Sequence, residues 1–166
     1  MANPAEIATF LKTVRLFREF AAPELLAFAS RLEEKSLRKG QVLFREGQPG
    51  EEMYVLRRGG VLISKAVTGR VDQVLAHVTV GDFFGEMSLF DRSPRSATIQ
   101  AETDAVLLTL NRDNLNLLIE VNPRAAAAFF HSLVQVFIER LRASGNLVAE
   151  VTRWGLEATG LDMESR

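Results

Sequence analysis

The sequence predicts a mainly β protein with flanking helices: an antiparallel β jelly roll, or double-stranded β-helix, with N-terminal helices and a long C-terminal helical segment. Short β-prone runs separated by turn residues fill the middle of the chain, and many short strands at this spacing are typical of antiparallel sandwiches, barrels and jelly rolls. Apolar residues recur at helical spacing on either side of that region. We expect N-terminal helices over 1–38, the jelly roll over 39–110, C-terminal helices over 111–153 and a tail over 154–166.

The first region should form two or three short helices. Its apolar residues recur at helical spacing from Ile7 to Leu32 and are interrupted at Pro23. Pro23 follows two alanines and fits the first turn of the second long helix, where its missing amide costs nothing. We expect this helical region to extend to about residue 38.

Six short β-prone runs follow Gly40. Turn residues separate these runs, and two of the turns have a recognisable type: Gln48–Glu51 fits a type II turn, and Thr68–Arg70 would close a hairpin. The predicted strands are Val42–Phe44, Met53–Leu56, Val61–Ser64, Val71–Thr79, Ala97–Ala101 and Ala105–Leu110.

Helical spacing returns at Asn111, and a long helix should begin after Asn122. Asn122 is suited to cap this helix, and Pro123 to occupy its first position. Gly145 should divide the helix into two segments. An apolar seam would run along it and pack either on the sandwich or on a second chain. Its positions are Val134, Phe137, Leu141, Val148 and Val151.

Composition excludes several classes of function. The 166 residues are 47% apolar and 25% charged, as in ordinary globular proteins. The net charge of −1 comes without a dense basic run, so nucleic acid is not an expected partner. The absence of cysteine excludes disulfides, thiolate metal sites and thiol nucleophiles in this chain. No segment has the roughly 20 apolar residues that span a membrane, so we expect a cytoplasmic protein without membrane insertion.

The stretch Gly81–Leu89, followed by Pro94–Thr98, carries the strongest chemical signal. Gly85 allows a ligand to approach the backbone closely, and the amides that follow it would form a helix N-terminus, which favours anions. Arg95 could reach the same anion with a planar fork of donors. This pattern predicts a site for a phosphorylated sugar. In the alternative interpretation, Glu86 and Arg95 pair with each other on a surface turn. The side chains of Met87 and Leu89 are expected in the core.

These features stand in the order of one known family. The chain resembles the cyclic nucleotide-binding domains of catabolite activator proteins, protein kinase A regulatory subunits and cyclic nucleotide-gated channels. The resemblance covers roughly Phe10 to Val151. It includes Phe44–Gly47, Tyr54–Leu56 followed by Gly59, and a phosphate-binding cassette over 85–97.

The resemblance implies a role for each residue of the cassette. Glu86 would accept a hydrogen bond from the ribose 2′-hydroxyl, and Arg95 would pair with the cyclic phosphate. The backbone amides of Gly85, Met87 and Ser88 would complete the cradle. A helix N-terminus and one arginine can balance the single negative charge of a cyclic phosphodiester, so no metal or other cofactor is required.

The resemblance is less specific about the base. Ser96 follows the arginine, where kinase-type cAMP sites usually have alanine, many cGMP sites have threonine and catabolite activator proteins have serine. A hydroxyl there could contact the phosphate or a guanine edge. We expect cAMP as the ligand, with cGMP close behind. Matching the pair Arg140-Leu141 to catabolite activator proteins places Ser144 near adenine, with Asn146 as a second candidate for base contact. Gly145 stands where a second hydroxyl residue would be expected.

The predicted function is a non-enzymatic cyclic nucleotide sensor. The two histidines, His77 and His131, lie far apart, and the usual serine-nucleophile and phosphate-loop motifs are absent. Movement of the C-terminal helices would signal to a protein effector or through a homodimer. In catabolite activator proteins a winged helix-turn-helix follows the long helix, but only a short segment follows Val151 here, so we expect action through a protein partner. The alternative is an interaction scaffold of the same fold that binds no cyclic nucleotide, or another ligand.

Overall fold

The computed structural model describes residues 3–67 and 71–158. The chain forms two compact units, Met1–Phe129 and Phe130–Arg166, and each is described by itself. The helices of the first unit are α1 (Pro4–Leu11), the 3₁₀ turn η1 (Arg15–Phe17), α2 (Ala22–Ala29), the 3₁₀ turn η2 (Glu86–Leu89) and α3 (Arg112–Val121), and α4 (Pro123–Ala158) begins there. The strands are β1 (Glu33–Leu37), β2 (Val42–Phe44), β3 (Glu52–Arg58), β4 (Val61–Val67), β5 (Val71–Val78), β6 (Phe83–Phe84), β7 (Thr98–Ala101) and β8 (Ala105–Asn111).

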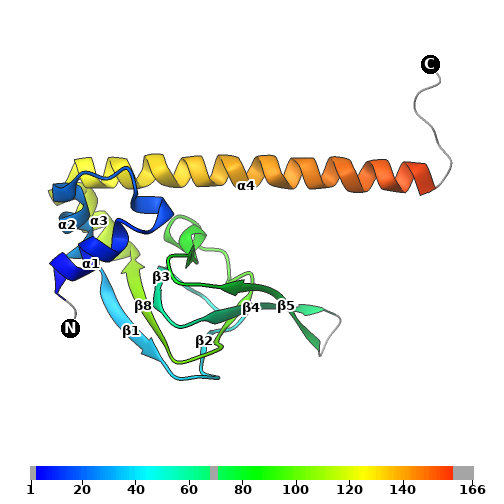
Figure 1. The fold of residues 1–166 in the computed structure, drawn as a ribbon, viewed down its shortest axis with the longest axis horizontal. Helices are drawn as coiled ribbons and strands as arrows, with labels where there is room; N and C mark the ends of the chain where they lie inside the picture. The colour runs from blue at the N-terminus through cyan, green and yellow to red at the C-terminus, as the bar shows by residue number, and fades with distance from the viewer. Residues whose placement is uncertain (1–2, 68–70, 159–166) are drawn as a thin grey trace, which may run out of the picture. The chain divides into compact units, whose positions relative to one another are not determined.

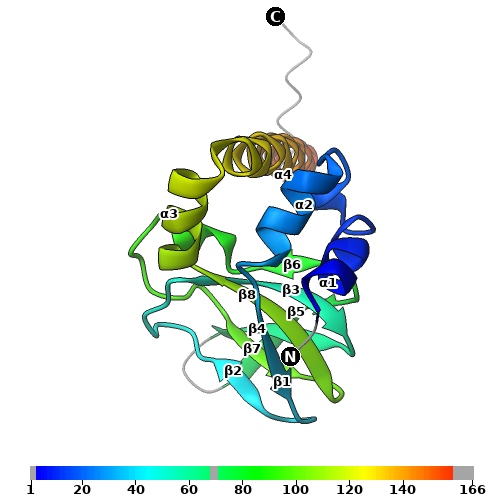
Figure 2. The ribbon, with the colours of Figure 1, turned by 90° about the vertical axis from the view of Figure 1, so that its left-hand side faces the viewer.

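The strands form two four-stranded sheets, with the orders β1-β8-β3-β6 and β2-β7-β4-β5. Every strand pair is antiparallel, and Figure 1 shows the resulting roll. Helices α1, α2 and α3 gather on one side of the sheets, as Figure 2 also shows. This architecture confirms the predicted fold class.

Two apolar clusters hold the first unit together. The inward side chains of both sheets form one cluster, which includes Tyr54, Leu56 and Leu107. Four aromatic rings of the helical region form the other, with centroids 4.8 Å apart for Phe17–Phe28 and 5.1 Å apart for Phe28–Phe129. Burying residues of this size removes most of their apolar surface from water, which stabilises the fold.

The predicted helical region ends too late in the chain. Residues Glu33–Leu37, expected within the N-terminal helices, form strand β1 and pair with β8 from Glu33↔Thr109 to Leu37↔Ala105. Only Leu37 of this strand is buried, so its sequence lacks the alternating apolar pattern that reveals strands. The two-residue strand β6 was also not predicted, whereas all six predicted runs do form strands.

The cap of α4 at Asn122 is as predicted, the cap of α3 at Asn111 was not predicted, and the expected break in α4 is absent. Asn111 Oδ1 accepts from Asn114 N at 2.8 Å, and Asn122 Oδ1 accepts from Ala125 N at 3.1 Å. Helix α4 runs from Pro123 to Ala158 without interruption at Gly145. A single glycine costs a helix only about 1 kcal/mol, which a helix of this length tolerates. No helix among the described residues is long and apolar enough to cross a membrane.

The two predicted turns have different outcomes. Gly50 does not have the positive φ that a type II turn over Gln48–Glu51 requires, so that prediction is wrong. The predicted hairpin turn Thr68–Arg70 lies outside the described residues, but the strands β4 and β5 on either side of it do pair, down to Val67↔Val71.

Candidate functional site

Arg95 is the centre of the candidate site. Its side chain is only 6% exposed. The Nη1 atom donates to the carbonyl oxygen of Glu52 at 2.9 Å and to Ser88 Oγ at 3.0 Å. The Nε atom is buried and has no hydrogen-bond partner in the described part of the chain. Both bonded acceptors are neutral, so the guanidinium charge is only partly compensated.

The backbone around Arg95 is fixed by the loop between β2 and β3. Arg95 N donates to the carbonyl oxygen of Gln48 at 2.8 Å, and Gly47 N donates to the carbonyl oxygen of Arg95 at 2.8 Å. This reciprocal pair holds the arginine against the start of β3. The backbone of Arg95 is therefore fixed, and its side chain extends from there to Ser88 in η2.

The guanidinium also lies on an aromatic surface. Its Cζ atom is 4.1 Å from the centroid of the Phe44 ring and 5.7 Å from that of Tyr54. A cation over a ring face at this distance is attracted by the ring quadrupole. On another side the guanidinium lies against Gly50, where a Cβ atom would be 2.5 Å from Nη2. Gly50 therefore provides space for the arginine, which is the role that the turn prediction missed.

A glutamate–tyrosine pair lies next to this stack. The Tyr54 hydroxyl donates to the Glu52 carboxylate. Burial, the hydrogen bond to Glu52 and the nearby Glu52 charge raise the pKa of Tyr54. Burial lowers the pKa of Arg95, while the charges of Tyr54 and Glu52 oppose that shift. Burial is thus the largest influence on both groups, and Glu52 favours the charged form of the arginine.

The turn of the cassette has the geometry that a close ligand approach requires. Gly85 has φ 76°, in the left-handed region, and precedes the 3₁₀ turn η2. A Cβ atom at Gly85 would lie 3.0 Å from both Arg95 Nη1 and the Glu52 carbonyl oxygen. Both the backbone conformation and the space therefore favour glycine here.

The structure brings Glu86, Ser88 and Arg95 into the buried part of the cassette. Glu86 is 4% exposed and Ser88 is 8% exposed, which is unusual for polar side chains. The Ser88 amide already donates to the carbonyl oxygen of Gly85 at 3.2 Å. The Ser88 hydroxyl accepts from Arg95 Nη1 and so helps to position the arginine. Both Glu86 and Arg95 are buried, which disfavours the alternative of an ion pair on a surface turn.

The other predicted residues lie in more open positions. The prediction that Met87 is a core residue is wrong, because its side chain is 63% exposed, while Leu89 is buried as expected. The short turn η2 directs Met87 outward between two buried neighbours. Ser96 is exposed beside the arginine. Ser144 and Asn146 are exposed on α4, in the second unit, and their contact with a base stays a prediction.

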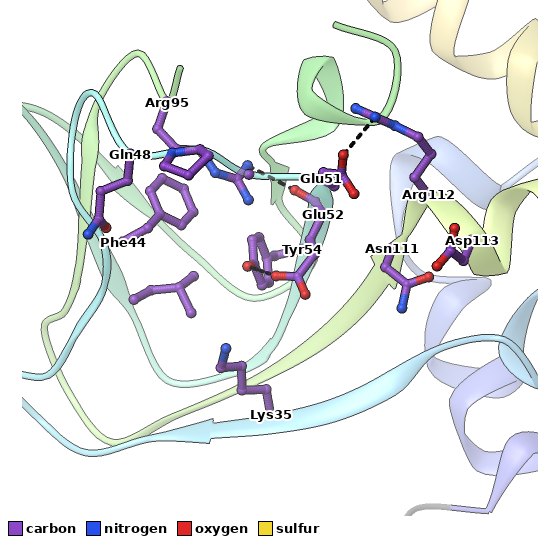
Figure 3. Close-up of a pocket in the computed structure, with 13 residues that line it drawn as sticks. Lys35, Phe44, Gln48, Glu51, Glu52, Tyr54, Arg95, Asn111, Arg112 and Asp113 are labelled. Carbon is purple, nitrogen blue, oxygen red and sulfur yellow. Dashed lines mark hydrogen bonds and ion pairs between the residues drawn. The ribbon is translucent and has the colours of Figure 1, made fainter. Parts of the chain in front are cut away.

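A pocket of about 480 Å³ lies on the strand side of Arg95. Figure 3 shows side chains from β1, β2 and β3 pointing into it, among them Lys35, Phe44 and Tyr54. Of the predicted ligand residues, only Arg95 is part of its lining, and the same side chain bonds to Ser88 in η2. Gly50, Glu52 and Arg112 also line the pocket, and none of them was predicted as part of the site.

Comparison with known proteins assigns this arrangement to a family. The family model for the cyclic nucleotide-binding domain matches residues 34–122. The chain belongs to this family. The match contains every strand from β2 to β8 and the complete cassette. The resemblance inferred from the cassette is thereby confirmed, and the domain is a cyclic nucleotide-binding domain.

Individual relatives include proteins named for both cyclic nucleotides. The chain is 26% identical over 136 residues to a CRP-like cAMP-activated global transcriptional regulator of Mycobacterium tuberculosis, which covers 82% of this chain and 59% of that protein. It is 33% identical over 114 residues to a cGMP-dependent protein kinase of Eimeria tenella, covering 69% of this chain and 11% of the kinase. The chain thus spans less than two thirds of the length of these curated relatives.

A solved structure supports the same conclusion. A cyclic nucleotide-binding domain from Methylobacillus flagellatus superimposes with a TM-score of 0.75 at 27% identity. The superposition covers 89% of this chain and 83% of that domain. The likeness therefore extends over most of both molecules.

Proposed function

We propose that this chain is a non-enzymatic cyclic nucleotide sensor whose cassette binds the cyclic phosphate through Arg95. The observation that carries the proposal is a guanidinium that is 6% exposed, has a buried Nε atom without a partner, and bonds only to neutral acceptors in the described residues. A buried charge is costly unless an opposite charge or strong hydrogen bonds compensate it. An anionic ligand beside Gly85 would supply that compensation.

The neighbouring residues fit the remaining parts of the ligand. Glu86 is buried next to the glycine turn, where its carboxylate can accept from a ribose hydroxyl. The backbone amides of Gly85 and Met87 would face the phosphate. The Ser88 hydroxyl would contribute indirectly, by accepting from Arg95 and holding the guanidinium in place. Ser96 is exposed next to the arginine and would contact the phosphate or the base.

We infer that cAMP is the principal ligand and cGMP the second candidate. The relatives include one protein named as cAMP-activated and one named as cGMP-dependent, so kinship alone does not choose between them. Ser96 favours cAMP by the resemblance to catabolite activator proteins. Parallel titrations with both nucleotides test this order of preference.

The output of the sensor is assigned to α4. Its seam residues Leu141, Val148 and Val151 are between 58% and 75% exposed, which suits a helix that pairs with a second chain or with an effector protein. Ser144 falls between Leu141 and Val148 at the same heptad spacing, so a homodimer would bring it to the seam. We propose a homodimer through α4, with Ser144 and Asn146 as the candidate contacts to the base.

The sensor proposal differs from its alternatives in the partners that it expects. The absence of a dense basic run argues against nucleic acid, but one relative is named a transcriptional regulator, so the expectation of no nucleic-acid partner stays a prediction. In the scaffold alternative, the buried charge of Arg95 would be offset by the Glu52 charge but by no anionic ligand. Protein effectors and a cytoplasmic location remain part of the sensor proposal.

Isothermal titration of the purified chain with cAMP and cGMP tests the function. We expect saturable binding, and Arg95→Ala should weaken it by more than about 1.4 kcal/mol, or tenfold, because a charge-assisted pair to phosphate is lost. Arg92→Ala is the matched control, since Arg92 is an exposed arginine in the same loop. Absence of binding at high micromolar concentration would favour the scaffold, and equal affinities of the two variants would place the phosphate elsewhere.

A further inference from the structure

Arg112, the first residue of α3, binds the end of the cassette turn. Its Nη2 atom donates to the carbonyl oxygen of Ser88 at 2.8 Å, and its Nε atom donates to that of Leu89 at 3.1 Å. These carbonyls belong to the last two residues of η2. The last carbonyls of a short helical turn have no partner within the turn, so an arginine that satisfies two of them fixes where the turn ends.

The opposite edge of the same guanidinium holds the loop before β3. Arg112 Nη1 donates to Glu51 Oε1 at 2.8 Å, and the backbone amide of Arg112 donates to the carbonyl oxygen of Glu51 at 3.1 Å. The Arg112 side chain is only 19% exposed, whereas that of Glu51 is 64% exposed. Figure 3 shows the ion pair at the edge of the pocket. One side chain therefore joins α3, the cassette turn and the β2–β3 loop.

Arg112 and Arg95 hold the same two segments from different sides. Arg95 bonds to the Glu52 carbonyl oxygen and to Ser88 Oγ, and Arg112 bonds to Glu51 and to the Ser88 carbonyl oxygen. A displacement of η2 would strain the contacts of both arginines. Because Arg112 begins α3, such a displacement would also act on that helix.

We propose that Arg112 is a positioning residue, which fixes η2 for anion binding and couples the cassette to α3. The proposal rests on the cyclic nucleotide function for the identity of the anion, but the positioning role is a property of the unliganded protein. A planar guanidinium can meet two consecutive carbonyls with one edge and a carboxylate with another. A lysine ammonium has the same charge but cannot span these three acceptors.

Hydrogen exchange of the unliganded chain, followed by mass spectrometry, tests the positioning role. In Arg112→Gln we expect the amides of residues 86–91 to exchange about tenfold faster, because hydrogen bonds from a charged group are lost. Arg57→Gln is the matched control, since Arg57 is 24% exposed and pairs with Glu34 at 2.7 Å. Unchanged exchange over 86–91 in Arg112→Gln, or an equal increase in Arg57→Gln, would overturn the proposal.

Two milder variants keep the test decisive if Arg112→Gln does not fold. Arg112→Lys preserves the charge and should still give faster exchange over 86–91, whereas wild-type exchange would show that charge alone suffices. Glu51→Gln removes only the carboxylate arm and should give a smaller increase than Arg112→Lys. An increase as large or larger would assign the effect to the β2–β3 loop and overturn the role of the carbonyl contacts.

The ligand arm separates this inference from the proposed function. If the wild-type chain binds cAMP, Arg112→Gln should lower its affinity about five- to tenfold while Arg57→Gln stays within about twofold. An unchanged affinity in Arg112→Gln would refute the link to anion binding. If the wild-type chain binds neither cAMP nor cGMP, the sensor function fails, and the exchange experiment still decides the positioning role.

Discussion

Replacing Gly50 with alanine should displace the key arginine without straining the backbone. The φ angle of Gly50 is outside the left-handed region, so alanine can adopt the backbone conformation. Its Cβ atom, however, would lie 2.5 Å from Arg95 Nη2 and closer still to Nε and Cζ, while real Cβ contacts stay above 3.0 Å. The Nε atom would be only 2.0 Å from that Cβ, so the guanidinium must move by about 1 Å or more.

The size of the effect follows from the bonds that this movement affects. Arg95 Nη1 has acceptors at 2.9 and 3.0 Å, and Phe44 limits movement on one side at 4.1 Å from Cζ. A shift of this size lengthens at least one of these hydrogen bonds beyond the donor–acceptor distance at which it still stabilises. Losing one hydrogen bond from a charged group costs about 1.5 kcal/mol. We therefore expect roughly tenfold weaker cyclic nucleotide binding and a comparable loss of unfolding free energy.

The assay is isothermal titration together with urea unfolding, with Gly60→Ala as the control. Gly60 also lacks a positive φ, but its nearest neighbours to an added Cβ are at ordinary distances of 3.5 and 3.8 Å. Gly60→Ala should therefore bind like the wild type. If Gly50→Ala and Gly60→Ala have the same affinity and stability, the packing of Gly50 against Arg95 does not position the arginine.

Three further predictions concern the tyrosine, a helix cap and the seam. The pKa of Tyr54 in the folded chain is raised above its ordinary 10.0. The stability that this pKa shift contributes is therefore fully present below pH 10 and is lost as the pH rises toward the folded-state pKa. In urea unfolding, the wild type should lose stability above pH 10 more steeply than Tyr54→Phe, and parallel curves would contradict this. Asn111→Ala removes the cap of α3 and should cost about 1 kcal/mol in thermal unfolding, while the exposed Asn116→Ala should cost much less. Leu141→Glu should convert a dimer to a monomer in light scattering, because Leu141 is 75% exposed on the seam; a wild-type monomer would exclude the dimer.

The sequence predicted the strands that are runs of β-prone residues and missed those that depend on pairing with a distant strand. The run Val61–Ser64 has a local pattern and forms part of β4. By contrast, Glu33–Leu37 has four exposed residues and is a strand because it pairs with β8, far along the chain. The predicted break at Gly145 was wrong, because one glycine does not outweigh the cooperativity of a long helix.

The candidate site shows the same division. Arg95 and Gly85 could be predicted because a short motif contains them both. Gly50 and Arg112 reach the arginine or the cassette from distant parts of the chain, and nothing local to their sequence indicates which atoms they meet. The exposure of Met87 depends on the direction in which a four-residue turn points its side chains, which composition does not specify.

A crystal structure of the chain grown with cAMP would test the central claim most directly. The account predicts a cyclic phosphate oxygen within hydrogen-bond distance of the Arg95 guanidinium, with the ribose 2′-hydroxyl at the Glu86 carboxylate. The contacts of Arg95 to Glu52 and Ser88 should persist, because they position the guanidinium from its other side. A nucleotide bound with its phosphate away from Arg95, or no nucleotide at saturating concentration, would contradict the account.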